Sequence, residues 1–342
     1  LIAEEFLQPV LHVPGHPLAL GRFGAYAAMP ASLLARRFRT DEAKALWGGV
    51  AAHAFRPFGG PVSSAIGAAL GTAAHRYGWP VAVGGSQRIH EAMTALLLKH
   101  GGRIETGVRV TSWDELGAPD LTLLDTSPSA AADIMGDRIP SRVSRAYRRY
   151  RHGPAAFQVA FAVDGGVPWQ HEPSRSAGTV HVSGSFAETA AAERDVWQGR
   201  MPVRPFVLVG QQYLADPGRS SGSVHPVDAY AHVPAGYTGD ATEAIIGQLE
   251  RFAPGFRERI VSQSVRSTSR IVAGNANYVG GDIVTGANTP RQLVFRPRPA
   301  LDPYSAGAKG VYLCSAATPP GAGAHGMCGH LAALSALRSV GP

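Results

Sequence analysis

Four side chains that bind metals or react in redox chemistry lie close together near the end of the chain. They are Cys314, His325, Cys328 and His330, within the stretch GVYLCSAATPPGAGAHGMCGH. Thiolate and imidazole ligands at short spacing are typical of zinc sites. The same stretch also has glycines between a short apolar run and an alanine-rich segment. That order is typical of a phosphate-binding turn at the start of a helix.

The spacing favours the backbone interpretation over the metal interpretation. Structural zinc sites usually pair two ligands in a CxxC knuckle with a second, distant pair. HGMCGH lacks that arrangement, and its glycines do not resemble a finger knuckle. Cys314 follows an apolar run and is typical of a small buried residue. We therefore predict no metal and expect backbone N–H groups and small side chains to carry the chemistry.

Composition indicates a folded, turn-rich protein that mixes helices and strands. The chain has 342 residues, 41 of them glycine and 26 proline, and only 17% are charged. It has no run of eighteen apolar residues and does not open with a secretory signal pattern. Two cysteines are typical of a reducing compartment, so we predict a cytoplasmic location. The chain begins with Leu1, and we expect it to be an N-terminally truncated piece of a longer protein.

A net charge of +7 raises the question of an anionic partner. The densest basic run is Arg142–Arg151, in SRVSRAYRRYR, and no nucleic-acid-binding signature accompanies it. We predict no nucleic-acid partner. The run is interpreted as a solvated basic surface, or as a patch that faces anionic lipid or substrate. A peripheral membrane contact therefore stays open.

The elements that position the glycine-rich stretch begin near Gly78. We expect a helix after Ser86, as N-cap, that ends at Gly101 and Gly102, followed by a strand at Glu105–Val110. The apolar run Leu121–Leu124 predicts a buried parallel strand. Alternation then predicts antiparallel strands, namely Ala155–Val163, Thr179–Gly184, Arg204–Gln212 and Val227–Pro234. A helix is expected after Asp240, and another at about Met327–Leu337.

Three blocks, in this order, resemble phytoene desaturase-like oxidoreductases of the amine oxidase-like flavoprotein group. They are PVAVGGSQRIHEAMTALLLKHGGRIETGVRV, NYVGGDI with the later RQLVFRPRP, and the closing GVYLCSAATPPGAGAHGMCGHLAALSAL. The resemblance implies an α/β (α+β) protein. A partial Rossmann-like FAD-binding domain would be interleaved with a substrate domain built on a mixed or antiparallel sheet. The implied segments are a helical cap region (1–77), FAD domain (78–137), substrate domain (138–300) and FAD domain again (301–342).

The resemblance also implies FAD as cofactor and a set of cofactor contacts. These are Gly84, Gly85, Val108, Val110, Ser315, Thr318, Gly321, Gly323, His325, Gly326 and Met327. Hydride transfer is chiefly the chemistry of the flavin, so the only catalytic candidate is His325. Its alternative is a loop residue that shapes the entrance of the helix.

The sequence departs from the family at its most specific motif. No GxGxxG turn after a strand occurs in residues 1–77. We therefore expect an FAD-dependent desaturase or dehydrogenase that acts on an apolar, terpenoid or lipid substrate, with an unidentified electron acceptor. The alternative is a non-enzymatic remnant or scaffold module that has lost FAD binding.

Overall fold

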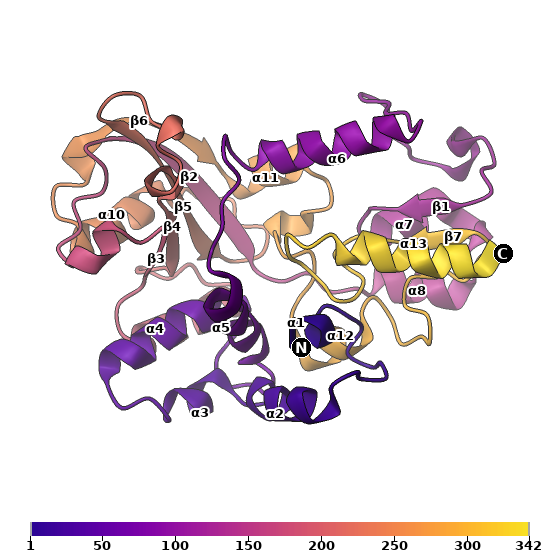
Figure 1. Cartoon of the computed structure of the whole chain (residues 1–342), viewed down its shortest axis with the longest axis horizontal. Helices are drawn as coiled ribbons and strands as arrows, with labels where there is room; N and C mark the ends of the chain where they lie inside the picture. Colours follow the sequence, from indigo (N-terminus) through magenta and orange to yellow (C-terminus); the bar gives the residue numbers. More distant parts are fainter. Residues whose placement is uncertain (1, 341–342) are drawn as a thin grey trace.

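The computed structural model describes residues 2–340 and confirms a mixed α/β fold. Figure 1 shows a five-stranded sheet toward one end of the molecule and a small parallel sheet toward the other. The strands are β1 (Thr122–Leu124), β2 (Ala155–Asp164), β3 (Thr179–Val182), β4 (Val207–Gly210), β5 (Val224–Val233), β6 (Ile260–Arg266) and β7 (Val311–Leu313). The longer helices are α2 (Pro17–Ala27), α4 (Asp41–Ala52), α5 (Ala65–Tyr77), α6 (Gln87–Lys99), α7 (Pro128–Met135), α8 (Ser141–Arg148), α9 (Phe186–Trp197), α10 (Thr242–Phe252) and α13 (Met327–Val340). The shorter ones are α1 (Ile2–Phe6), α3 (Ala31–Ala35), α11 (Thr268–Gly274) and α12 (Pro290–Phe295). No helix among residues 2–340 is long and apolar enough to cross a membrane.

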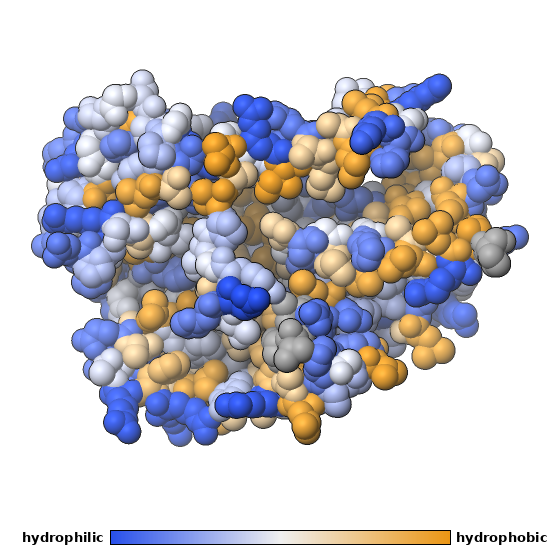
Figure 2. Space-filling view, in the orientation of Figure 1, coloured by the Kyte–Doolittle hydropathy of each residue, from blue (hydrophilic) through white to orange (hydrophobic). Residues whose placement is uncertain are grey.

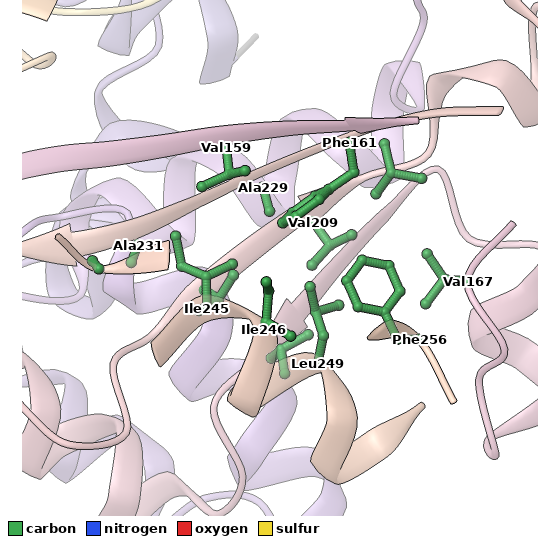
Figure 3. Close-up of a cluster of buried hydrophobic side chains, with 14 of the residues drawn as sticks. Val159, Phe161, Val167, Val209, Ala229, Ala231, Ile245, Ile246, Leu249 and Phe256 are labelled. Atoms are coloured by element: carbon green, nitrogen blue, oxygen red, sulfur yellow. The ribbon is translucent and has the colours of Figure 1, made fainter. Parts of the chain in front are cut away.

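The large sheet is antiparallel, with the strand order β3-β4-β5-β2-β6. All four strands predicted from alternation are present, within a few residues of the expected bounds. Figure 3 shows α10 placing Ile245 and Leu249 against the inward side chains of the sheet, including Val159 and Val209. Because these side chains are almost fully buried, this contact forms the largest apolar core described.

The parallel pair β1–β7 joins distant parts of the chain. Its register places Thr122 opposite Val311 and Leu124 opposite Leu313. Val311 and Leu313 pack with α7 and α8, whereas Tyr312 packs with α13 on the other face. Successive side chains of a strand point to opposite faces, so these three residues are buried from both sides. The closing segment therefore returns to lie beside the strand predicted at Leu121–Leu124.

The strand expected at Glu105–Val110 does not form. The segment is irregular, Gly107 has a φ of 75°, and Val108 is 64% exposed. A strand needs a partner for its backbone groups, and none of the described strands pairs with this segment. Ser86 does occupy the N-cap position of α6, but its side chain accepts no capping hydrogen bond.

Helix α6 forms as expected but buries none of its residues in the described part of the chain. Its apolar side chains are half or more exposed at Ile89, Met93 and Leu96. Figure 1 shows the helix lying along one edge, apart from the core of the small sheet. The amphipathic pattern therefore predicted the helix without predicting what it packs against.

Two histidines connect the N-terminal helical region to the large sheet. The Nε2 atoms of His53, which follows α4, and His181, on β3, are 2.9 Å apart. Burial lowers the pKa of His53 to about 3, helped by repulsion from His181 and His232. Burial likewise lowers the pKa of His181 to about 4. One Nε2 donates and the other accepts, so both rings are neutral in the folded protein.

We expect the free energy of unfolding to fall as the pH drops below 6.5, the ordinary value for these histidines. Their folded pKa values are depressed, so the unfolded chain binds more protons than the folded protein below pH 6.5. Stability therefore falls as the pH drops, until it reaches the folded pKa of His181, about 4, and then that of His53, about 3. Each ring that stays neutral lowers the free energy of unfolding by about 2 kcal/mol as the pH falls from 6.5 to about 5. Urea denaturation across this range measures the slope. In the double variant His53→Leu/His181→Leu the slope becomes shallower, and an unchanged slope would contradict the assignment.

The two amphipathic helices give a second expectation about stability. Leu249→Ala on α10 removes a fully buried side chain, so we expect a loss of about 2–5 kcal/mol. The matched change Leu96→Ala on α6 removes a side chain that is 56% exposed, and should shift stability by less than about 0.5 kcal/mol. Chemical denaturation of both variants checks this. A similar loss in both would show that α6 packs on something that this fold does not reveal.

Candidate functional site

The candidate site lies at the carboxyl ends of β1 and β7, where ligands of open α/β sheets usually bind. The chain leaves β1 into Asp125–Ser127 and leaves β7 into Cys314–Thr318. The Cys314 N–H donates to the Leu124 carbonyl at 3.0 Å, so the two exits are held side by side. Parallel pairing thus brings together two loops that are far apart in the sequence.

Ser315 and Thr318 stabilise the turn that follows β7. The Thr318 hydroxyl and the Thr318 N–H both donate to the Ser315 carbonyl, at 2.8 and 2.9 Å. The Ser315 hydroxyl accepts from the Ala317 N–H at 3.3 Å. Both residues are buried, Thr318 completely. In this arrangement their side chains shape the loop, and their backbone is what a ligand would approach.

Two of the predicted glycines are required by close neighbours. A Cβ atom on Gly321 would collide with the guanidinium of Arg296, and one on Gly323 would lie 2.6 Å from the His325 ring. Gly321 and Gly326 also have positive φ angles of 110° and 65°. The loop therefore tolerates no side chain at Gly321 or Gly323, and it brings bare backbone up to the start of α13.

His325 lies at the entrance of α13. Its Nδ1 accepts the Met327 N–H at 3.0 Å, in the way that a capping side chain does. Burial lowers the pKa of His325. The ring is therefore neutral, and its remaining proton is on Nε2. The next N–H groups of α13 have no partner within the helix, since the first turn of any helix lacks one.

The structure brings together Ser315, Thr318 and the other predicted residues up to Met327, but not the rest of the predicted set. The Gly84 N–H donates to Asp216 of the large-sheet region at 2.8 Å, and Gly85 follows it in the same turn. Val108 and Val110 lie in the irregular segment after α6. None of the hydrogen bonds among residues 2–340 joins these four to the β7–α13 loop. Their cofactor role stays a prediction.

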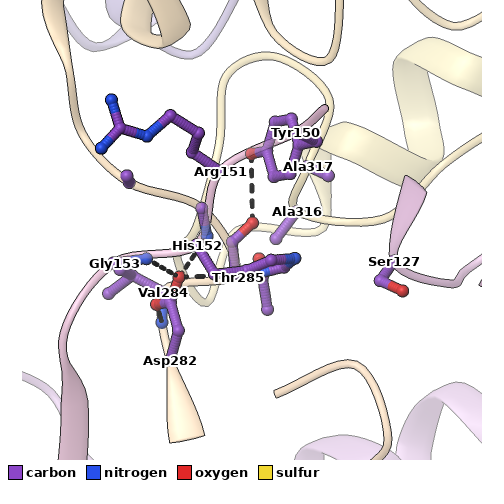
Figure 4. Close-up of polar contacts among 12 residues, drawn as sticks. Ser127, Tyr150, Arg151, His152, Gly153, Asp282, Val284, Thr285, Ala316 and Ala317 are labelled. Atoms are coloured by element: carbon purple, nitrogen blue, oxygen red, sulfur yellow. Dashed lines mark hydrogen bonds and ion pairs between the residues drawn. The ribbon is translucent and has the colours of Figure 1, made fainter. Parts of the chain in front are cut away.

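The sequence did not identify Asn277 and Asp282 as site residues. The Asn277 side chain accepts from the Ser127 N–H and donates to the Asp125 carbonyl, both at 2.9 Å, which secures the exit of β1. Figure 4 shows Asp282, completely buried, beside Gly153. Its carboxylate accepts three backbone N–H groups, those of Gly153, Val284 and Gly286, at 2.7–3.0 Å. The sequence signal that could have identified them is the occurrence of Asn and Asp in a Gly-rich loop, where such side chains often hydrogen-bond to backbone groups.

Two buried arginines share one asparagine beside the loop. Arg56 donates to the Asn288 carbonyl at 2.8 Å, and Arg296 donates to the Asn288 side-chain oxygen at 3.0 Å. Neither arginine forms an ion pair with a carboxylate in the described part of the chain. Arg296 also donates to the Ala316 carbonyl at 3.4 Å. The loop after β7 therefore lies against positive charge that no carboxylate neutralises.

The cysteines contribute no reactive thiolate. Both are free. Burial raises the pKa of Cys314 to about 12, and it also raises the pKa of Cys328. The Cys328 thiol donates to the Gly321 carbonyl at 3.3 Å. Among the described residues, no three His, Cys, Asp or Glu side chains are grouped to hold a metal ion. The site is thus one of backbone, small side chains and arginine.

Sequence similarity is found to pyridine nucleotide-disulfide oxidoreductase domain-containing protein 2 of Rattus norvegicus and of Mus musculus. Each is 32% identical over 93 residues, which are 27% of this chain and 16% of the relative. The matched segment is therefore only a small part of the length of these relatives. No protein-family model matches it.

The fold is similar to that of an oxidoreductase from Methanosarcina mazei, with a TM-score of 0.57 and 13% identity. The match covers 98% of this chain and 75% of that one. The partial homology is to oxidoreductase domain proteins, and the structural match shows that this chain shares its fold with an oxidoreductase. Neither finding singles out phytoene desaturase-like proteins.

The contribution of the Asp282 carboxylate to stability can be tested by substitution. Asp282→Ala leaves three buried N–H groups without their acceptor, so we expect a loss of about 3 kcal/mol in the free energy of unfolding. Asp282→Asn keeps one oxygen and should lose less. The control Asp164→Ala removes an exposed carboxylate at the end of β2 and should change little. Urea denaturation compares the three, and equal losses in Asp282→Ala and Asp164→Ala would count against the role.

Proposed function

We propose that this protein is an FAD-dependent oxidoreductase of the desaturase or dehydrogenase type, phytoene desaturase-like, acting on an apolar substrate. One observation carries the proposal. A glycine-rich loop at the carboxyl ends of a parallel strand pair leads directly into the first turn of a 14-residue helix, α13. That arrangement suits the anionic and polar part of a dinucleotide cofactor.

The residues of the loop fit such a ligand. Gly321 and Gly323 leave no room for a Cβ, so only backbone faces outward. The α13 dipole and the Arg296 guanidinium both favour negative charge beside the loop. When bound, FAD would supply the hydride acceptor. The residues of this chain would hold the cofactor and stabilise charge on it.

His325 has a positioning role in this proposal. Its Nδ1 is occupied by the Met327 N–H, so the ring cannot also accept a proton there without losing the cap. Its Nε2–H is directed at the Gly321 backbone carbonyl. The ring thus ties the start of α13 to the glycine-rich loop, whereas a general base would need a free acceptor.

The substrate side is less defined by the chain. The large antiparallel sheet is proposed as the substrate domain, and both this role and the apolar substrate are proposed from the resemblance. Trp169 is not available to line a cavity, because it is buried and donates to Gln211 at 3.0 Å. The absence of a GxGxxG turn from the sequence favours one alternative, a scaffold module that does not bind FAD.

Titration of FAD into the protein expressed from its full reading frame distinguishes the FAD-dependent oxidoreductase from the scaffold module. We expect flavin absorption bands to co-purify or to appear on addition of FAD. Gly323→Val should weaken binding at least about tenfold, since its side chain collides with His325 and enters the cradle. The control Gly247→Ala, in open space on α10, should bind FAD as the unchanged protein does. A folded protein that takes up no FAD supports the scaffold and overturns the oxidoreductase.

A further inference from the structure

A groove of about 630 Å³ separates α8 from residues 289–299. Its walls come from two segments that are far apart in the sequence. The charged residues that line it are all arginines, namely Arg142, Arg145, Arg149, Arg151, Arg291 and Arg298. The basic run found in the sequence thus forms only half of a larger cluster, which we call the arginine groove.

Helical spacing puts one part of the cluster on a single face. Arg142, Arg145 and Arg149 occur at intervals of three and four along α8 and its C-cap, so they share that face. The opposite face buries Val143 and Tyr147 in the core of the small sheet. The three arginines are exposed, and none has an ion pair within residues 2–340.

The second wall is fixed to the first by backbone contacts. The Arg151 N–H donates to the Gln292 side chain, which in turn donates to the Arg151 carbonyl, both at 2.9 Å. Gln292 belongs to α12, so this pair ties α12 to the end of α8. The backbone segments that carry the arginines are therefore tied to each other.

No Asp or Glu is among the residues that line the groove. Asp133 pairs with Arg148 at 2.7 Å, and Asp137 lines a neighbouring groove that shares Arg145 and Arg149 with this one. Like charges held together repel one another, and this repulsion is relieved when an anion binds. Guanidinium groups match the oxygens of phosphate through paired hydrogen bonds.

An apolar groove of about 350 Å³ adjoins the arginine groove and shares Phe295, Arg298 and Pro299 with it. Leu11 and Leu301 also line it, and both are highly exposed, at 68% and 108%. The space-filling view in Figure 2 shows hydrophobic and hydrophilic residues interspersed on this face of the molecule. The two grooves together offer a basic end and an apolar end to one ligand.

We propose that these grooves bind a phosphate ester of an apolar chain, with the phosphate among the arginines and the chain along Phe295 and Leu301. The α8 arginines lie outside the β7–α13 loop, whereas the apolar groove extends to Arg296 and Pro319 beside it. The inference is therefore tested through the α8 arginines and Leu301, independently of flavin binding. Two sources carry this ligand chemistry, a phospholipid at a membrane surface and a soluble phosphate ester. A nucleic acid shares only the phosphate, and it would make no use of the apolar groove.

Co-sedimentation with phosphatidylcholine vesicles, with and without phosphatidylglycerol, tests the membrane source. The triple variant Arg142→Ala/Arg145→Ala/Arg149→Ala should bind the anionic vesicles roughly 100-fold more weakly. The control Arg259→Ala/Arg266→Ala/Arg270→Ala removes the same charge from exposed positions at the large sheet and should bind as the unchanged protein does. Leu301→Ser should weaken binding and leave its salt dependence unchanged.

Calorimetry with dihexanoyl phosphatidylglycerol, kept below its micelle concentration, tests the soluble source. Binding of one molecule per chain, lost in the α8 triple variant, supports the site without a membrane. Binding to vesicles alone supports the membrane source. The proposal is overturned if neither probe binds, or if both triple variants lose binding equally. It is also overturned if duplex DNA binds through the same arginines while Leu301→Ser has no effect on any probe.

Discussion

The pairing of β1 with β7 is the contact on which the candidate site depends. Only three residues of each strand take part, yet they bring together Leu124 and Leu313, which are far apart in the sequence. Helices α7 and α8 cover one face and α13 covers the other. Such a short pair is stable because it is buried on both sides. Without it, the glycine-rich loop would have no fixed position relative to Asp125 or to the buried arginines.

Local pattern predicted the elements whose partners are local or strongly apolar. Ala155–Val163 alternates and became β2, and the glycine-rich loop does lead into α13. The sequence pattern predicted strands wrongly where strand formation depends on pairing with a distant segment. Glu105–Val110 resembles a strand but finds no neighbour, whereas Ile260–Arg266 was missed because most of this edge strand is exposed and polar. A strand is a property of two segments, and one segment alone does not specify it.

The missed site residues share one physical cause. Arg296 and Asp282 are charged types that occur mostly at surfaces, so nothing local marks them as buried. In the folded protein, hydrogen bonds from three backbone N–H groups take the place of water around the Asp282 carboxylate. Hydrogen bonds to the Asn288 side chain and to backbone carbonyls do the same for the Arg296 guanidinium. These contacts span more than a hundred residues in the case of Gly153 and Asp282. Only the fold brings the donor to the acceptor.

Arginine is used in two different physical settings in this chain. At α8 the guanidinium groups are exposed and screened by salt, so their electrostatic effect depends on their number and their shared face. Arg296 is buried and hydrogen-bonded to neutral oxygens, so its field reaches the β7–α13 loop with little screening. A charge held in this way does not need to reorganise when negative charge develops nearby. One buried arginine beside a helix N-terminus can therefore matter more to the loop than the whole surface cluster.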